Sequence, residues 1–277
     1  MPYSRQWREV NRLPTLEHEE FFELLMISPS YQLATAIKKG AIKMPPLNKR
    51  PTDFDKVLKI YGLVGDISEI LFDHWWQTTG QHLFFDSHKS EVINVAIDLT
   101  RDKKDLLNEI NKLIDSQKQK PETSIKISFI KNKVRYKTLS SRVNLVHDFA
   151  AKRTLRSNFE YWRLAVFTGL KSQYIEGLKV DSKKTADNNV AREKLTELVS
   201  KHLKEALYFS ENAARGHFPS NASIETGLDF DFELIKEIGS RQAKKESNYM
   251  YEHRKIGQQR LNDSQRMKLK KRNKKLK

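Results

Sequence analysis

The chain of 277 residues contains no cysteine, only ten glycines and eight prolines, and no long uninterrupted hydrophobic run. Without cysteine it holds no disulfide framework, no thiol nucleophile and no cysteine-ligated zinc site. Its apolar runs are far shorter than the roughly 20 residues that an α-helix needs to cross a bilayer. The opening residues MPYSRQWREV do not form a signal or transit peptide. We therefore expect a cytoplasmic protein without membrane spans.

Signatures of the common enzyme classes are also missing. The sequence has no nucleophile elbow, no phosphate-binding loop and no dinucleotide fingerprint. His74, His82 and His88 are spaced so that no single helical face collects them, which argues against a metal site. Acidic triplets at 66–73 and 229–233 have the composition of a nuclease magnesium site, but such triplets are common by chance. We expect no catalytic residues and no cofactor.

Positive charge is what the chain has in excess, with a formal net charge of +16. The stretch from 241 to 277 holds fourteen Lys or Arg against three acids, which leaves only +5 on the first 240 residues. A dense cationic tail attracts polyanions by counterion release, and nucleic acid is the commonest such partner. Because apolar residues thin out there, we predict that this tail is disordered. We expect phosphate contacts from Lys270, Lys271, Arg272, Lys274 and Lys275.

Hydrophobic periodicity predicts a mostly α fold with a small β element (α+β). Apolar residues alternate with polar ones over 93–99 and again over 125–129, which indicates two strands that could pair in parallel around a helix. Three regions follow: an N-terminal α/β region at 1–130, a helical region at 131–240 and the basic tail at 241–277.

Several helices can be placed by their ends. The first opens at Thr15 and stops at Pro29, and the longest runs over about 190–214. The adjacent tryptophans Trp75 and Trp76 lie on a further predicted helix. Aromatic rings also stack on nucleic-acid bases, but neighbouring tryptophans on a helix point in different directions, and we expect packing, with at least one of the two in the core.

The stretch from 161 to 180, YWRLAVFTGLKSQYIEGLKV, predicts two short helices that meet at a tight turn. Ala165 is small enough for a close helix crossing, and Gly169 suits a turn that needs positive φ. A second helix would begin at Ser172 and pack Ile175 back on the first. This pattern resembles the helix-turn-helix of bacterial DNA-binding proteins such as repressors and resolvases. The alternative is an ordinary αα-hairpin in a helical core.

The resemblance implies a recognition helix whose exposed groups meet DNA. These groups are Lys171, Ser172, Gln173, Tyr174 and Glu176. Upstream cations that would grip the phosphate backbone are Arg153, Arg156 and Arg163. Glutamine bonds adenine in the major groove, and lysine takes guanine or phosphate. The motif departs from the usual pattern at Gly177, which weakens the second helix.

Three hypotheses for function remain. The first is a non-enzymatic DNA-binding protein, a regulator or DNA-maintenance factor of a bacterial mobile element or phage, whose partner is nucleic acid, with DNA favoured over RNA. The second is a scaffold or packaging protein that assembles with copies of itself and uses the basic tail for an acidic partner. The third is a metal-dependent nuclease. The sequence offers no sign of a small-molecule substrate.

Overall fold

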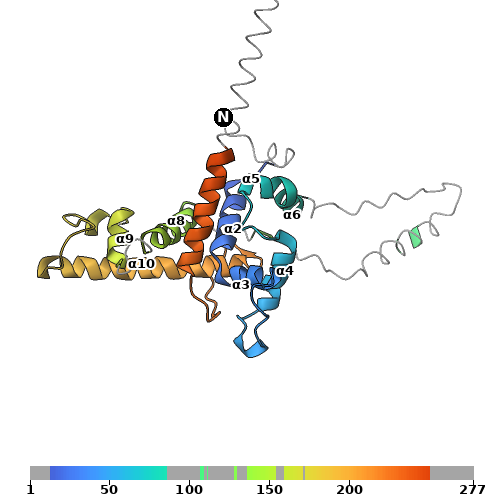
Figure 1. Cartoon of the computed structure of the whole chain (residues 1–277), viewed down its shortest axis with the longest axis horizontal. Helices are drawn as coiled ribbons and strands as arrows, with labels where there is room; N and C mark the ends of the chain where they lie inside the picture. The colour runs from blue at the N-terminus through green and yellow to red at the C-terminus, as the bar shows by residue number, and fades with distance from the viewer. Residues whose placement is uncertain are drawn as a thin grey trace, which may run out of the picture.

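The structure is a computed structural model, and its fold is mostly helical, as predicted. The residues that it describes are 13–85, 107–108, 111, 128–129, 136–153, 159–170 and 172–249. One long helix, α10 (Ala186–Ala213), runs through the molecule, and the other described helices pack against it or against each other (Figure 1). Its inward face repeats at helical spacing through Leu195, Val199 and Leu203, all of which are buried.

The N-terminal helices gather at the C-terminal end of α10 (Figure 1). They are α2 (Leu16–Ile27), α3 (Pro29–Lys38), α4 (Phe54–Val64), α5 (Phe72–Trp75), a π-helical stretch (Trp76–Gly80) and α6 (Gln81–Phe85). The start of α2 at Thr15 and the stop before Pro29 confirm the predicted bounds of the first helix. Ser28 caps α3, because its hydroxyl oxygen accepts a hydrogen bond from the Tyr31 backbone N–H.

Both tryptophans are buried, whereas at least one was expected to be, with 1% exposure for Trp75 and 5% for Trp76. The ring of Trp75 lies 5.1 Å from that of Phe22 on α2, and its indole N–H donates to the Val64 carbonyl at 3.2 Å. The preference for core packing over base stacking is confirmed.

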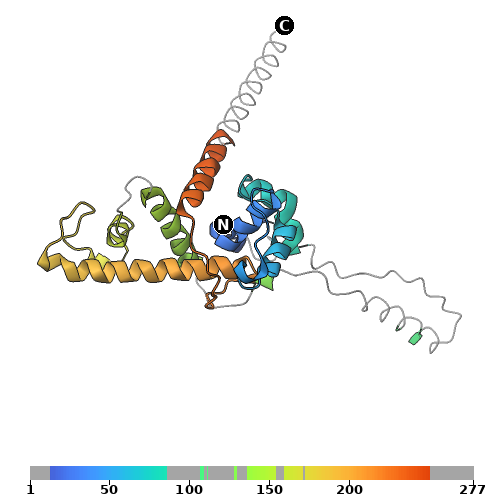
Figure 2. The same ribbon diagram turned by 60° about the horizontal axis from the view of Figure 1, so that its bottom comes forward.

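Helices α8 (Tyr136–Arg153) and α9 (Tyr161–Phe167) lie along the other part of α10 (Figure 1). A further helix at 232–249 packs beside α8, where the Phe149 and Phe232 rings are 4.8 Å apart. Figure 2 shows this helix rising steeply away from α10.

The helix at 232–249 corrects the predicted start of the disordered tail at 241. The side-chain amide of Gln242 donates to the carbonyls of Ile70 at 2.8 Å and Ile67 at 3.3 Å. Arg241 and Lys245 both pair with Glu69. The folded body therefore extends at least to residue 249, because these contacts join the helix to the N-terminal elements. The five cations expected to contact phosphate lie beyond it, outside the described residues.

The small β element is a parallel pair of two-residue strands, β1 (Ser128–Phe129) and β2 (His217–Phe218). Ser128 stands opposite His217, and Phe129 opposite Phe218. The predicted strand at 125–129 is thus present in part as β1. Its partner within the described chain is β2, which follows α10 in the sequence. The predicted strand at 93–99 lies outside the described residues.

Candidate nucleic-acid interface

The stretch from 161 to 180 forms the predicted turn but not the predicted recognition helix. Gly169 has a φ of 67°, and the Leu170 N–H donates to the Ala165 carbonyl at 2.9 Å. Beyond the turn, Ser172–Tyr174 form a single 3₁₀ turn in place of an α-helix. Gly177 then adopts a φ of 77°, which is incompatible with a continuing right-handed helix. The expected second α-helix is therefore wrong.

This hairpin packs its apolar side on α10. Leu164 and Ala165, which carry part of the resemblance to a helix-turn-helix, are fully buried in the core, and Leu178 is 8% exposed. Of the expected base-contacting groups, Gln173 and Glu176 are exposed. Lys171 and the side chain of Ser172 lie outside the described residues.

Other residues that were expected to contact DNA make contacts within the protein instead. The Lys194 ammonium lies 5.4 Å from the Tyr174 ring. Arg163 pairs with Glu160 at 3.1 Å, donates to a backbone carbonyl and stacks over a tryptophan ring. Arg153 is exposed but lies over Phe232 at 5.5 Å. Arg156 is outside the described residues. Within the described residues, Arg153 and Arg163 are therefore each engaged by other groups of the protein.

The charge of the hairpin and the first half of α10 is nearly balanced. Seven Lys or Arg and six Asp or Glu lie between 159 and 200. An anionic duplex gains little from such a surface, because its positive and negative charges nearly cancel.

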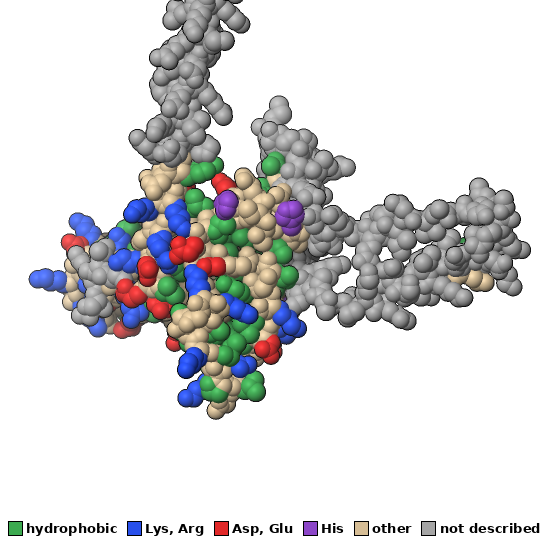
Figure 3. Space-filling model, turned by 45° about the vertical axis from the view of Figure 1, so that its right-hand side comes forward, with side chains coloured by type: hydrophobic (Ala, Val, Ile, Leu, Met, Phe, Trp, Pro, Cys, Tyr) green, Lys and Arg blue, Asp and Glu red, His purple; other side chains and the backbone are tan. Residues whose placement is uncertain are grey.

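A different part of the body carries uncompensated positive charge. We define the basic protrusion as residues 38–59, which run from the end of α3 through a loop into α4. It holds seven cations against two acids. The cations are Lys38, Lys39, Lys43, Lys49, Arg50, Lys56 and Lys59. Its loop reaches farthest from the body at the bottom of Figure 1, and Figure 3 shows blue and green side chains gathered there.

Among the described residues, most of these cations have no acidic partner. Lys39 pairs with Asp66 at 2.6 Å, and Lys56 pairs with Asp53 at 2.9 Å. The other four lysines, Lys38, Lys43, Lys49 and Lys59, are exposed and form no ion pair with any described residue. This region was not singled out from the sequence, although the local count of cations and acids could have identified the patch.

Hydrogen bonds within the loop of the protrusion hold its shape. The Arg50 side chain donates from Nε to the Pro45 carbonyl at 2.7 Å, which closes the loop across its tip. A short 3₁₀ helix, η1 (Leu47–Lys49), lies between them, and the Lys49 N–H donates to the Pro46 carbonyl at 2.9 Å. The tip therefore holds a defined shape although nearly all of it is exposed.

A buried ion pair fixes the root of the protrusion. Glu211 and Arg215, at the end of α10, are 0% and 1% exposed in their side chains and 2.8 Å apart. The Glu211 carboxylate accepts from the Ser28 hydroxyl at 2.8 Å and the Ser30 N–H at 2.9 Å, at the start of α3. Arg215 donates to the Thr52 carbonyl from Nη2 at 2.7 Å and from Nε at 3.1 Å. This hydrogen-bond network therefore holds both α3, which precedes the loop, and the backbone at Thr52, which follows it.

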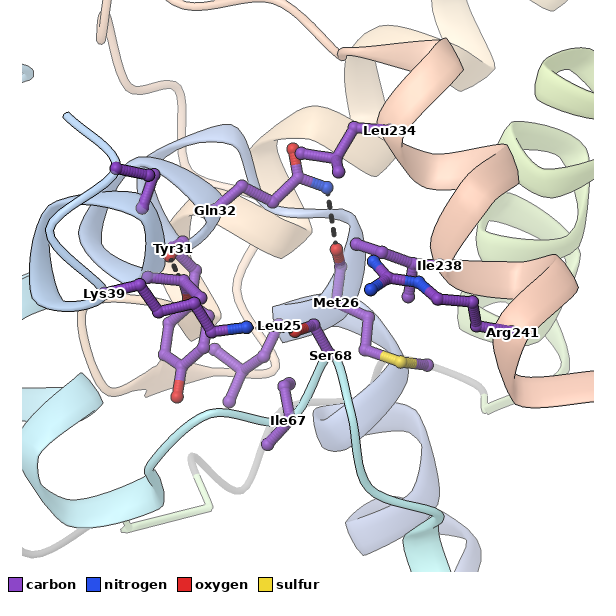
Figure 4. Close-up of a pocket in the computed structure, with 13 residues that line it drawn as sticks. Leu25, Met26, Tyr31, Gln32, Lys39, Ile67, Ser68, Leu234, Ile238 and Arg241 are labelled. Atoms are coloured by element: carbon purple, nitrogen blue, oxygen red, sulfur yellow. Dashed lines mark hydrogen bonds between the residues drawn. The ribbon is translucent and has the colours of Figure 1, made fainter. Parts of the chain in front are cut away.

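An apolar cavity of about 180 Å³ lies beside this root, between α3, the turn at 66–68 and the helix at 232–249 (Figure 4). Its walls include Leu25, Ile67 and Ile238, and Lys39 lies at its edge. Burial raises the pKa of Asp66, but hydrogen bonds from Lys39 and Ser68 outweigh this and leave the pKa below its ordinary value. Asp66 is therefore ionised at neutral pH and keeps Lys39 paired.

In the part of the chain that the structure describes, no three His, Asp or Glu side chains group where they could hold a metal ion. No helix in that part is both long and apolar enough to span a membrane. No protein-family model, curated protein or solved structure matches the chain.

Proposed function

We propose that the protein is a non-enzymatic nucleic-acid-binding protein, with duplex DNA as the preferred partner. The observation that carries this proposal is the set of four exposed lysines of the basic protrusion that form no ion pair with any described residue, two of which lie on its braced loop. Each lysine that meets a phosphate releases condensed counterions, which favours binding without any sequence information. In this proposal the basic protrusion is the contact of the folded body, and the cations beyond residue 249 add affinity for any sequence.

The proposal differs from the helix-turn-helix interpretation in where the body meets DNA. The hairpin at 161–180 offers a 3₁₀ turn on a nearly neutral surface. The protrusion offers excess charge, exposure and a fixed shape. A role as regulator or maintenance factor of a mobile element or phage stays a prediction.

The test replaces the four unpaired lysines of the protrusion by glutamine in the full chain: Lys38, Lys43, Lys49 and Lys59. Binding to a random-sequence duplex is measured by fluorescence anisotropy over a range of salt concentrations. If all four meet phosphates, the slope of log K against log salt should become shallower by roughly 3 to 4, since each contact contributes about 0.9. The melting temperature should be unchanged, because these side chains are exposed.

The matched control removes the same charge from the hairpin side of the molecule, by glutamine substitutions at Lys179, Lys183, Lys184 and Lys201. These lysines are also exposed. We expect a clearly smaller change in slope. An equal change in both variants would contradict the assignment to the protrusion, and a larger one in the control would favour the hairpin. A wild-type chain that does not bind duplex DNA even at low salt would contradict the proposed function itself.

A further inference from the structure

We propose that the apolar tip of the basic protrusion inserts into the minor groove of duplex DNA as a wedge between base pairs, and so bends the DNA. This inference rests on the proposed function and adds to it the mode of contact. Proteins that bend DNA from the minor groove commonly insert aliphatic side chains between base steps, with cations on the flanking phosphates.

The tip exposes aliphatic surface that the fold does not use. Leu47 is 79% exposed, Ile42 is 49% exposed and Met44 is 40% exposed. The three side chains lie within six residues and include the most exposed large apolar residue among those described. Single exposed apolar residues need no explanation, but Leu47 stands on the 3₁₀ helix at the tip of a protruding loop, and Ile42 and Met44 precede it on the arm that leads out from α3.

Two of these four lysines stand on the loop that carries this tip, one on each side of Leu47 in the chain. Lys43 lies on the arm that leads out to Leu47, and Lys49 follows it on the arm that returns. The minor groove is bordered by a phosphate backbone on each side. An apolar tip with a cation on each arm therefore matches a groove, with the wedge toward the bases and the lysines toward the two strands.

The rigidity of the loop favours insertion. Parting two stacked base pairs costs a few kcal/mol. A flexible loop would add the entropy of its own ordering to that cost, whereas this loop is already held by the bond from Arg50 to the Pro45 carbonyl and by the 3₁₀ turn. Pro45 and Pro46, which precede Leu47, restrict the backbone further.

A lipid surface is the competing partner for a cationic loop with an apolar tip. Stable membrane anchoring requires a large buried apolar area or a second lipid-binding signal. Three partly exposed aliphatic side chains on one loop provide little area, whereas one side chain is enough to part a base step. The observations therefore favour the duplex.

The experiment measures bending of a short DNA duplex labelled at its two ends with a donor and an acceptor dye. Full-length wild type should raise the energy transfer at saturating protein, and Leu47→Ala should lose that rise while keeping its melting temperature. The control Val190→Ala removes an apolar side chain of 59% exposure on α10, and it should bend DNA as the wild type does.

The outcomes separate the wedge from the proposed function. Wild type that binds the duplex without raising energy transfer, or Leu47→Ala that bends it fully, would overturn the wedge and leave nucleic-acid binding intact. Absence of any duplex binding would overturn both. Sedimentation with phosphatidylcholine–phosphatidylglycerol vesicles completes the test. Vesicle binding that depends on Leu47, without DNA bending, would overturn the wedge in favour of a lipid surface.

Discussion

His18 lies at the start of α2, enclosed by aromatic rings. Its ring centre is 4.4 Å from that of Trp76 and 4.6 Å from that of Phe84, and the residue is 5% exposed. Its Nδ1 atom accepts a hydrogen bond from the Thr15 N–H at 2.9 Å, which requires this nitrogen to be unprotonated. Burial lowers the pKa of His18 to about 4, although the nearby Glu17 carboxylate acts in the opposite direction. A neutral imidazole is therefore part of the cap of α2.

Because the pKa of His18 is lower in the folded than in the unfolded state, the unfolded chain binds the extra proton as the pH falls below 6.5. The contribution to stability is complete above pH 6.5 and declines toward pH 4. We expect the free energy of unfolding to fall by about 2 kcal/mol from this group between pH 7 and pH 5. Urea unfolding of wild type and His18→Gln at both pH values checks this. A pH dependence that is the same in both proteins would refute it.

At the scale of elements, the buried network of Glu211 and Arg215 joins the end of α10 to α3 and to the chain that enters α4. Removal of one partner leaves the other charge buried and uncompensated. We expect Glu211→Ala to lower the free energy of unfolding by about 3 to 5 kcal/mol. The exposed pair of Lys56 and Asp53 is the control, since Lys56→Ala should change stability by less than about 1 kcal/mol. Denaturant unfolding measures both, and similar small losses would show that the network is not a stabilising clamp.

The helix at 232–249 is joined to the N-terminal helices by Gln242. Replacement by alanine leaves the carbonyls of Ile67 and Ile70 without this donor. We expect Gln242→Ala to destabilise the protein by about 1 to 2 kcal/mol and to speed amide hydrogen exchange in this helix. Gln173→Ala, at an exposed site in the hairpin, should do neither. Unchanged exchange rates in Gln242→Ala would mean that other contacts hold the helix.

At the scale of the whole molecule, positive charge divides between the protrusion and the region beyond residue 249. A chain ended at 249 should stay folded and bind duplex DNA more weakly, with a shallower salt dependence and the same relative preference among sequences. A chain ended at 240 should also lose stability, because it lacks the contacts of Gln242 and Lys245. Thermal unfolding and salt titrations of the two chains check this. Equal stability of both would show that 241–249 add nothing to the body.

Local patterns in the chain were sufficient for the helical class, the bounds of the first helix and most of α10, and the preference for core packing at the tryptophan pair. Helix periodicity and capping depend on neighbours a few residues apart, so they can be read directly. The hairpin at 161–180 shows where local reading failed. The sequence indicated the turn at Gly169 correctly. It did not indicate that Gly177 takes a positive φ, which is incompatible with the expected second α-helix.

The candidate interface depends on contacts between residues that are distant in sequence. The total charge follows from composition alone, yet Lys39 is neutralised by Asp66 while Lys38 and Lys43 have no ion pair with any described residue. The clamp at the root of the protrusion joins Ser30 to Glu211 across 181 positions of the chain. Such pairings arise when helices pack, because packing decides which side chains meet and which face the solvent. A linear sequence states which charges exist, but folding decides which of them are paired and which remain exposed without an ion pair to a described residue.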